Sequence, residues 1–325
     1  MCSQRAFGAH SLESNERAAL VAIGNFDGVH RGHRAVLAQA LSRARSAGLL
    51  PLVLTFDPHP AAVVGRGALP ALTSLERKLE LLCRQGPELK VVVEPFTAEL
   101  ANTSPSVFVE QLLVRKLNSR VVLVGENFRF GRAREGDFGL LAELGDTFGF
   151  EARAAALESD EQGAVSSTRV RQRLEAGDLA EVERLLGRPH AISGAVQVGD
   201  GRGRSIGIPT ANLGGIREAL PPHGVYAVLV DRKTEAGFSR LSAGVANFGV
   251  RPTLGAGPSF ETHLFDFSAD IYGAELRVHL VERLRDEQKF SGVDELRAQI
   301  QRDIEVARAV TRDRKPDPSA LGAWY

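Results

Sequence analysis

The sequence has few of the features that mark secreted, membrane-spanning or metal-cluster proteins. Its 325 residues include two cysteines, Cys2 and Cys83, which are too few for a disulfide framework or a four-cysteine zinc site. The longest apolar runs, such as residues 49–54, are far shorter than the ~20 residues that cross a bilayer. Residues 1–16 carry charges and no apolar signal core. We therefore predict a soluble protein of the reducing cytoplasm that binds no membrane.

Net charge and aromatic residues are also scarce. The 40 Lys and Arg balance 40 Asp and Glu, and aromatic residues make up 6% of the chain. The protein therefore lacks both the positive field and the stacking surface that nucleic-acid binding needs. The 43% of apolar and 25% of charged residues are typical of globular proteins. At ~150 residues per domain the length predicts about two domains, and we expect a monomer or a weak homo-oligomer.

The first half alternates short apolar runs with helical patterns. The apolar runs predict buried strands at residues 18–23, 49–56, 91–96 and 120–124. Between them, Leu75, Leu79 and Leu82 recur at helical spacing, and Ser104-Pro105 has the form of an N-cap and first turn. This alternation predicts an α/β domain with a Rossmann-like, doubly wound parallel sheet, whose ligands bind beyond the carboxyl ends of the strands.

The pattern changes after residue 186. Asp178 opens a helix that ends before Gly187, so we predict one domain at 1–186 and a second at 187–325. The second half contains runs cut by Gly and Pro, which predict strands at 192–198, 224–231, 240–247, 259–267 and 275–284. These strands favour a small antiparallel barrel, followed by a helix from Val293. Residues 311–325, with two prolines and mixed charge, predict a loose tail.

The run GNFDGVHRGH, residues 24–33, follows the first predicted strand and opens a helix. His30 and His33 share one helix face, and the free N–H groups of a helix start favour an anion. Glycines in this run let the backbone approach a phosphate closely. We predict that both histidines are catalytic and stabilise charge on a phosphoryl group in transfer. The alternative is a glycine turn with surface histidines.

Three further loops are predicted at the same sheet edge. Asp57 and His59 follow the second strand, in a loop that Pro58 and Pro60 fix. The run GENFRFGR, residues 125–132, has aromatic and basic side chains that suit a planar ring and a phosphate. The run SSTRVR, residues 166–171, opens a helix with hydroxyls and guanidiniums. A solvated loop and plain helix capping are the respective alternatives for the last two.

The HxGH and SSTxxR signatures resemble those of the nucleotidylyltransferase superfamily. The fuller set, GNFDGVHRGH, TFDPHP, GENFRFG and SSTRVR, resembles the FMN adenylyltransferase half of the prokaryotic bifunctional FAD synthetases. The resemblance implies an ATP and phosphate site at Gly24, Asn25, Phe26, Asp27, Gly28, Ser166, Ser167, Thr168 and Arg171. It implies an FMN site at Asp57, His59, Asn127 and Phe128. Asn127 stands where Asp is common in the family, which leaves the handling of metal at this site open.

A second phosphate loop is predicted at residues 199–212. It fits neither a Walker loop nor a dinucleotide fingerprint, since no Lys follows its glycines and Ile206 interrupts the second pattern. Its glycines with Arg202 and Arg204 suit a triphosphate, and Thr210 and Asn212 offer oxygen ligands to Mg²⁺. Downstream, Glu261 falls on one face of a predicted strand and is a candidate general base. A surface hairpin and an exposed strand glutamate are the alternatives.

The motifs GRGRxxGxPTAN, GVY, NxGxRPT and ETHLFDF are similar to those of the riboflavin kinase domain, a six-stranded antiparallel β-barrel with a terminal helix. The resemblance assigns the catalytic base to Glu261 and the Mg²⁺ ligands to Thr210 and Asn212. It implies an ATP site at Gly201, Arg202, Gly203, Arg204, Gly207 and Pro209. It implies a flavin site at Asn247, Arg251, Arg285 and Phe290. Ile208 stands where the family has Phe or another large apolar residue.

Together the two halves resemble an enzyme that phosphorylates riboflavin with ATP to give FMN, then adenylylates FMN with ATP to give FAD and pyrophosphate, with Mg²⁺ in both steps. Two alternatives stay open. One is a flavin-binding module without turnover, which would have no need for His30, His33 and Glu261. The other is an adenylyltransferase for a different acceptor, such as nicotinate mononucleotide or phosphopantetheine, against which the kinase-like half argues.

Overall fold

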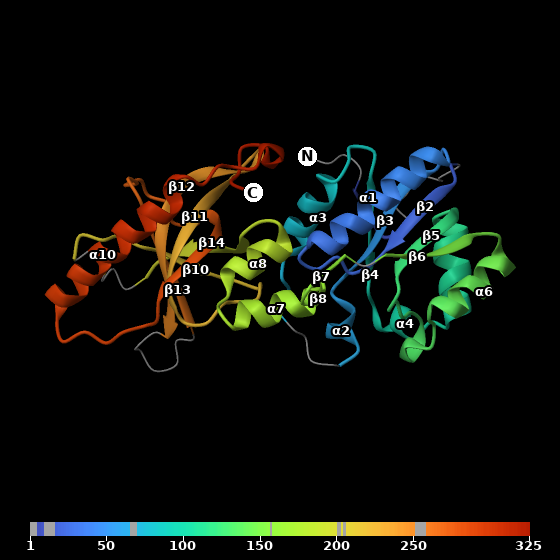
Figure 1. Cartoon of the computed structure of the whole chain (residues 1–325), viewed down its shortest axis with the longest axis horizontal. Coiled ribbons are helices and arrows are strands. Elements are labelled where there is room, and N and C mark those ends of the chain that lie inside the picture. The colour runs from blue at the N-terminus through green and yellow to red at the C-terminus, as the bar shows by residue number, and fades with distance from the viewer. Residues whose placement is uncertain are drawn as a thin grey trace. The chain divides into compact units, whose positions relative to one another are not determined.

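The computed structural model describes residues 5–9, 17–65, 70–156, 158–199, 203, 206–250 and 258–325. The chain divides into two units (Figure 1). One holds residues 2–71 and 75–167, and the other holds residues 72–74 and 168–325. Within the described ranges, no helix combines the length and the apolar composition that crossing a membrane requires.

The first unit is built on a six-stranded sheet in which all neighbouring strands are parallel, in the order β1-β4-β3-β2-β5-β6. The strands are β1 (Arg5–Phe7), β2 (Ala19–Ile23), β3 (Leu50–Asp57), β4 (Lys90–Pro95), β5 (Ser119–Gly125) and β6 (Glu151–Ala155). The doubly wound parallel sheet is therefore confirmed. The edge strands β1 and β6 were not predicted, because one is only three residues long and the other contains two charged side chains.

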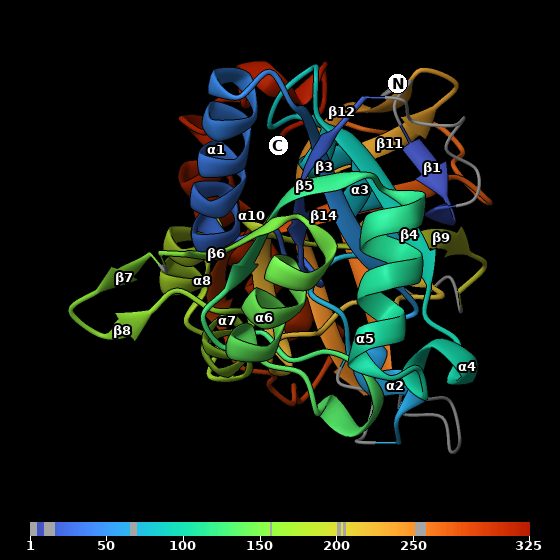
Figure 2. The ribbon, with the colours of Figure 1, turned by 90° about the vertical axis from the view of Figure 1, so that its right-hand side faces the viewer.

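Helices cover both faces of this sheet and bury its apolar residues. Helices α1 (Arg31–Ser46) and α3 (Leu75–Cys83) pack on one face. The other face carries α5 (Pro105–Phe108), the π-helix Val109–Lys116 and α6 (Phe138–Phe148). Figure 2 shows α5 and α6 in front of the strands. Burial on both faces explains why β2 to β4 are almost continuously apolar.

Short elements complete the first unit. Helices α2 (Pro60–Val63) and α4 (Ala98–Ala101) follow β3 and β4. The strands β7 (Ser159–Asp160) and β8 (Gly163–Ala164) form a hairpin that projects from the sheet (Figure 2).

Two helices, α7 (Ser167–Glu175) and α8 (Leu179–Leu186), follow the hairpin and group with the second unit. The predicted boundaries of α8 are confirmed. Asp178 caps its start by accepting a hydrogen bond from the Glu181 N–H at 3.1 Å, and Gly187, at φ +70°, ends it.

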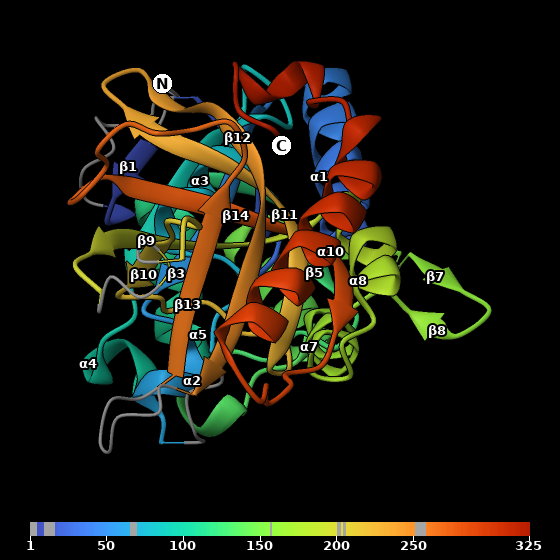
Figure 3. The ribbon, with the colours of Figure 1, turned by 90° about the vertical axis from the view of Figure 1, so that its left-hand side faces the viewer.

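The rest of the second unit is a closed barrel of six antiparallel strands, in the order β10-β13-β12-β11-β14-β9 (Figure 3). The strands are β9 (His190–Gln197), β10 (Ala211–Gly214), β11 (Gly224–Thr234), β12 (Gly237–Val250), β13 (Pro258–Leu264) and β14 (Glu275–Arg285). Helix α10 (Val293–Arg312) packs along it. The barrel and its terminal helix are confirmed. Strand β10 was not predicted, because its four residues follow a loop rich in glycine.

The prediction of a loose tail is wrong for residues 313–325. A short 3₁₀ helix, Pro318–Ala320, is followed by the buried Ala323. The backbone N–H of Trp324 donates to Asp231 Oδ1 at 2.9 Å, and Asp231 is fully buried beside His279. The segment is thus held by a buried carboxylate more than 90 residues away in sequence, which composition alone does not reveal.

Candidate active sites

The turn from β2 into α1 positions the two predicted catalytic histidines. His30 is the N-cap of α1, and its Nδ1 accepts a hydrogen bond from the His33 N–H at 3.2 Å. The two rings stack with their centroids 3.6 Å apart. Phe26 lies beneath them, with its ring 5.2 Å from that of His33 and with a left-handed φ of +49°. The predicted sharing of one helix face is confirmed, whereas the catalytic role stays a prediction.

The absence of a side chain at Gly32 lets the backbone at Val165 approach this turn closely. A Cβ at Gly32 would lie 2.9 Å from the Val165 carbonyl oxygen and 3.2 Å from His30 Nδ1. Nearby, Ser167 Oγ donates to the Asp27 carbonyl oxygen at 2.8 Å. The HxGH turn and the start of the SSTxxR run, 140 residues apart, therefore meet as predicted. Thr168 and Arg171 lie in α7, which groups with the second unit, and their phosphate-binding role stays a prediction.

His33 is held in its neutral form. Burial, the neighbouring His30 and the charge of Lys78 together lower the pKa of His33 well below its ordinary value. Its Nδ1 is buried and has no hydrogen-bond partner among the described residues. A neutral imidazole can bind a ligand only through hydrogen bonds and not as a permanent cation. This refines the expectation that both rings neutralise charge.

Lys78, on α3, is a functional candidate that the sequence analysis missed. Its ammonium group donates to the carbonyl oxygen of Phe56 at 3.1 Å, to Thr55 Oγ1 at 3.3 Å and to the carbonyl oxygen of Asn25 at 3.4 Å. Burial lowers its pKa, although Asp27 and Asp57 oppose that shift. Lys78 thus ties the end of β2 to the end of β3. In the sequence it resembles any lysine on a solvated helix face.

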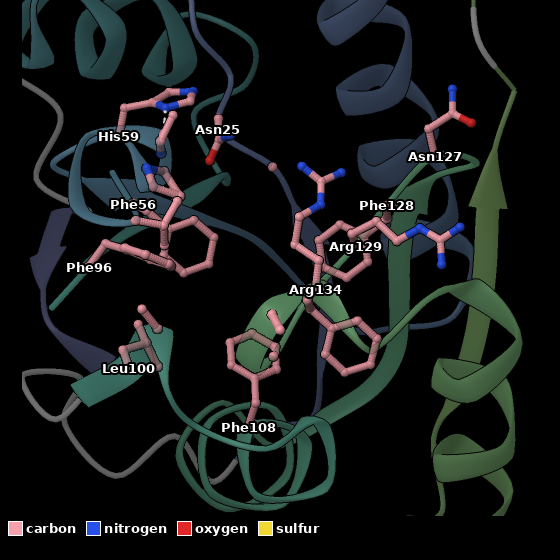
Figure 4. Close-up of a pocket in the computed structure, with 18 residues that line it drawn as sticks. Asn25, Phe56, His59, Phe96, Leu100, Phe108, Asn127, Phe128, Arg129 and Arg134 are labelled. Carbon is pink, nitrogen blue, oxygen red and sulfur yellow. Dashed lines mark hydrogen bonds between the residues drawn. The ribbon is translucent and has the colours of Figure 1, made fainter. Parts of the chain in front are cut away.

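A cavity of about 350 Å³ opens at the carboxyl ends of the strands (Figure 4). Its lining includes residues that follow β2 and β5, between which the strand order reverses, so the cavity lies at the switch point where such sheets bind ligands. The predicted residues Gly24, Asn25, His59, Asn127 and Phe128 line it. Asp57 does not line it and is exposed.

Five phenylalanines are among the residues that line this cavity. In Figure 4, Phe56 and Phe96 lie on one side and Phe108 and Phe128 on the other. Phe56 and Phe96 meet edge to face, with their centroids 5.6 Å apart, and Phe128 stacks on Phe130 at 5.5 Å. Phe128 was predicted by number, and Phe130 belongs to the aromatic run 125–132 that was predicted to suit a planar ring. Phe56, Phe96 and Phe108 sit where strands end or in a helix, and from sequence they are indistinguishable from core residues.

A second cavity, of about 540 Å³, lies in the barrel unit between the loop before β10, strands β12 and β13, and α10. The predicted residues Gly203, Thr210, Asn247, Glu261, Arg285 and Phe290 line it. Ile208 is buried in the same lining, so this departure from the family pattern keeps an apolar wall. Gly207, at φ +79°, and Pro209 flank the loop without lining the cavity. Gly201, Arg202, Arg204 and Arg251 lie outside the described residues.

Glu261 is the chemical centre of this second cavity. The barrel register places it opposite Asn212 on one side and Asn247 on the other. Thr210 Oγ1 donates to its Oε2 at 3.3 Å, and Ser259 Oγ donates to its Oε1 at 3.4 Å. The side chain is half-buried, so Glu261 is not the exposed strand glutamate of the alternative interpretation.

The donor set around Glu261 fits Mg²⁺ better than a transition metal. Within the described ranges, no group of three or more His, Cys, Asp or Glu side chains suits a metal ion. Mg²⁺ needs few protein ligands, because it keeps waters and binds substrate phosphates, and it prefers carboxylate and hydroxyl oxygens such as those of Glu261 and Thr210. Asn212 does not line the cavity, and its amide packs against Gly199.

The predicted flavin residue Arg285 is already paired. Its guanidinium binds both carboxylate oxygens of Asp303 on α10, at 2.8 to 3.1 Å, and lies 5.8 Å from the centre of the Phe290 ring. This arrangement suits the shaping of a flat binding surface and not the binding of a free anion. Arg297, also on α10, donates to the Ile206 carbonyl oxygen and fixes the end of the phosphate loop.

Comparisons with known proteins cover nearly the whole chain. The FAD synthetase family profile matches residues 12–169, and the riboflavin kinase profile matches residues 186–311. The chain is 41% identical to a bifunctional riboflavin kinase/FMN adenylyltransferase of Escherichia coli (strain K12), over 95% of this chain and 98% of that protein. It is 36% identical to a protein of the same description from Bacillus subtilis, over 92% and 94%.

One solved structure resembles nearly the whole chain. It is a crystal structure described as a macrolide-efflux protein from Streptococcus pneumoniae, with a TM-score of 0.81 and 29% identity, covering 94% of this chain and 99% of that one. The likeness supports the two-unit architecture. Its description differs from that of the curated relatives and applies to that protein.

Replacing Lys78 by Met should lower the free energy of unfolding by about 1–3 kcal/mol, because buried acceptors lose their donor. The control is Lys116→Met, the same change at an exposed position of the same unit, with an expected effect within ~0.5 kcal/mol. Urea unfolding, followed by circular dichroism, measures both. Equal stability of the two variants would contradict the tying role of Lys78.

Proposed function

The chain belongs to the family of bifunctional riboflavin kinases/FMN adenylyltransferases, and we propose that its two cavities are the sites of the two reactions. The C-terminal domain phosphorylates riboflavin with ATP to give FMN, and the N-terminal domain adenylylates FMN with ATP to give FAD and pyrophosphate. We assign residues 1–186 to the second reaction and 187–325 to the first. The ranges that the two family profiles match support this division.

In the N-terminal domain, the aromatic cavity would hold the isoalloxazine ring of FMN between its phenylalanine walls. The phosphate of FMN would then attack the α-phosphorus of ATP, and pyrophosphate would leave. His30 and His33, at the start of α1, would hydrogen-bond the reacting phosphates, with the helix N–H groups beside them. The observation that carries this assignment is the position of cavity and histidines at one edge of the parallel sheet.

Other predicted residues of this domain take supporting roles. Phe26 packs under His33, and Asp27 accepts from Ser167 through its backbone, so both shape the turn. Asn25 shares its carbonyl oxygen between Thr55 and Lys78 while it lines the cavity. These contacts support positioning, on which nucleotidyl transfer depends.

In the C-terminal domain, Glu261 would accept the proton of the ribityl 5′-hydroxyl as that oxygen attacks the γ-phosphorus of ATP, and ADP would leave. The hydroxyls of Thr210 and Ser259 orient the carboxylate for this role. Mg²⁺ held by the Thr210 hydroxyl would neutralise phosphate charge. Asn212 would take part only after its amide leaves Gly199.

The small-molecule substrates follow from family membership, and the other expectations are proposals. We propose a protein of the cytoplasm that works as a monomer or weak homo-oligomer without nucleic acid or membrane. The zero net charge supports the absence of a nucleic-acid partner.

A chromatographic time course tests the assignment. The purified full-length protein is incubated with riboflavin, ATP and Mg²⁺, and the flavins are separated at each time point. FMN should rise and then give way to FAD. Accumulation of FMN alone would overturn the assignment of the first cavity, and binding without conversion would favour a flavin-binding module. Adenylylation of nicotinate mononucleotide or phosphopantetheine in place of FMN would favour the other alternative.

His30→Ala should slow FAD formation from FMN on the order of 10²–10³-fold, the effect of losing one charge-stabilising donor, and leave riboflavin phosphorylation unchanged. Because His30 also caps α1, His30→Asn is the matched variant, since Asn preserves an N-cap. Both variants should lose FAD formation to a similar extent. Recovery by Asn would show that capping, not catalysis, is the role of His30.

Glu261→Gln should slow FMN formation on the order of 10²–10⁴-fold, the range for a positioned general base, because an amide accepts no proton at neutral pH. FAD formation from added FMN in the same preparation serves as the control for folding. Retention of full kinase activity would exclude Glu261 as the base.

A further inference from the structure

Among the described residues that line the aromatic cavity of the first unit, one arginine has no charged partner. Three arginines follow Phe128 in the loop between β5 and α6. Arg129 Nη1 pairs with Asp137 Oδ2 at 3.1 Å, and Arg132 Nε lies 3.5 Å from Glu135 Oε1. Arg134 lines the cavity, and its guanidinium has no hydrogen bond or ion pair with any described residue. Figure 4 shows its side chain extending away from Phe108 and past Phe128, and Arg134 is exposed to solvent.

Among the described residues of this lining, the pairing of Arg129 leaves Arg134 as the arginine without a charged partner. The hydrogen bond from the Leu140 N–H lowers the pKa of Asp137, and the nearby charge of Arg129 lowers it further. The carboxylate of Asp137 is therefore ionised and neutralises the charge of Arg129. Figure 4 shows the guanidinium of Arg129 pointing away from the cavity. None of the described residues that line the cavity is acidic. The part of the lining that the structure describes therefore combines apolar walls with a positive charge that no carboxylate of this lining compensates.

The backbone of the loop holds Arg134 in this position. Ala133 and Arg134 both have left-handed φ values, +51° and +63°, which cost a residue with a side chain on the order of 1–3 kcal/mol. Hydrogen bonds between Phe130 and Gly136 close the base of the loop at 2.9 and 3.1 Å. Gly131 packs against Pro105 so closely that a Cβ would lie 2.7 Å from its ring. The loop is therefore fixed at both ends while Arg134 lines the cavity.

The substrates of the two domains make a charge in this cavity selective. Riboflavin and FMN carry the same ring and differ in the 5′-phosphate, so phenylalanine walls alone bind both alike. A guanidinium binds phosphate through two parallel N–H···O bonds and gains nothing from the neutral ribityl hydroxyl of riboflavin. An uncompensated cation in the cavity thus favours the phosphorylated flavin.

We propose that Arg134 binds the 5′-phosphate of FMN and makes the adenylyltransferase domain select FMN over riboflavin. This proposal rests on the assignment of the aromatic cavity to the flavin. Arg134 is a specificity-determining residue in this arrangement. It fixes the phosphate that will attack ATP, whereas Arg129 and Arg132 stabilise the loop.

The test measures FAD formation by the full-length protein from added FMN and ATP with Mg²⁺. Arg134→Met, which keeps an unbranched side chain, should raise the KM for FMN on the order of 10- to 100-fold, the effect of losing a charged hydrogen bond. The kcat and the KM for ATP should change less than about threefold, because binding lost equally in ground and transition states appears in KM. Arg134→Lys should recover part of the affinity.

Arg132→Met is the matched control, since it removes an arginine of the same loop that does not line the cavity, and it should leave all constants unchanged. Inhibition by lumiflavin, which has the flavin ring without ribityl chain or phosphate, isolates ring binding. Arg134→Met should leave that inhibition constant unchanged. A rise in the KM for ATP instead of FMN, or equal behaviour of the Arg134 and Arg132 variants, would overturn the proposal.

Phe108→Ala separates this proposal from the assignment of the cavity. If it raises both the KM for FMN and the lumiflavin inhibition constant, the flavin occupies the cavity. The Arg134→Met result then supports or refutes the role of Arg134 independently of the cavity assignment. If Phe108→Ala changes neither constant, the cavity assignment fails, and with it the proposed role of Arg134.

Discussion

The first unit depends on one constraint, which is that all strands of a parallel sheet end at the same edge. The pairing of β2 with both β3 and β5 brings the residues after each of them to a common rim. Strand ends leave backbone carbonyl groups without sheet partners, and burial makes such groups costly. Lys78 satisfies two of them, from Asn25 and Phe56, with one ammonium group. The loops after β2 and β3 are thus joined by the ammonium group of Lys78, which lies on helix α3 and not in a loop.

In the barrel, site residues from different strands are brought together by the closure of the sheet and by the register between its strands. Three neighbouring strands place Asn212, Glu261 and Asn247 in one row, so that a carboxylate sits between two amides. Thr210, just before β10, completes the group with its hydroxyl. Because every strand of a closed barrel is paired, the row cannot slip without breaking the ladders on both sides. The site therefore depends on the register between strands, which the sequence of a single strand does not reveal.

Pairing of charges distinguishes arginines that build the protein from arginines that are free to bind. Arg285 is held by Asp303 and Arg129 by Asp137, and both shape a cavity wall or a loop. Arg134 stands in a cavity whose described lining has no carboxylates. The described linings of the two cavities accordingly differ in kind: one has a positive charge without a carboxylate among phenylalanines, and the other has a carboxylate with hydroxyl donors.

The sequence by itself determined what depends on local spacing. The strands β2 to β5, the start of α8 at Asp178 and the shared face of His30 and His33 follow from apolar runs, capping residues and helical periodicity, and the motifs identified the family. Tertiary structure decided what depends on partners far along the chain. It buried Lys78, brought the unforeseen Phe56, Phe96 and Phe108 into the same lining as Phe128, and docked Trp324 on Asp231. It also paired Arg129 and left Arg134 without a partner in the part of the chain that the structure describes, because whether a guanidinium meets a carboxylate is set by loop geometry and not by composition.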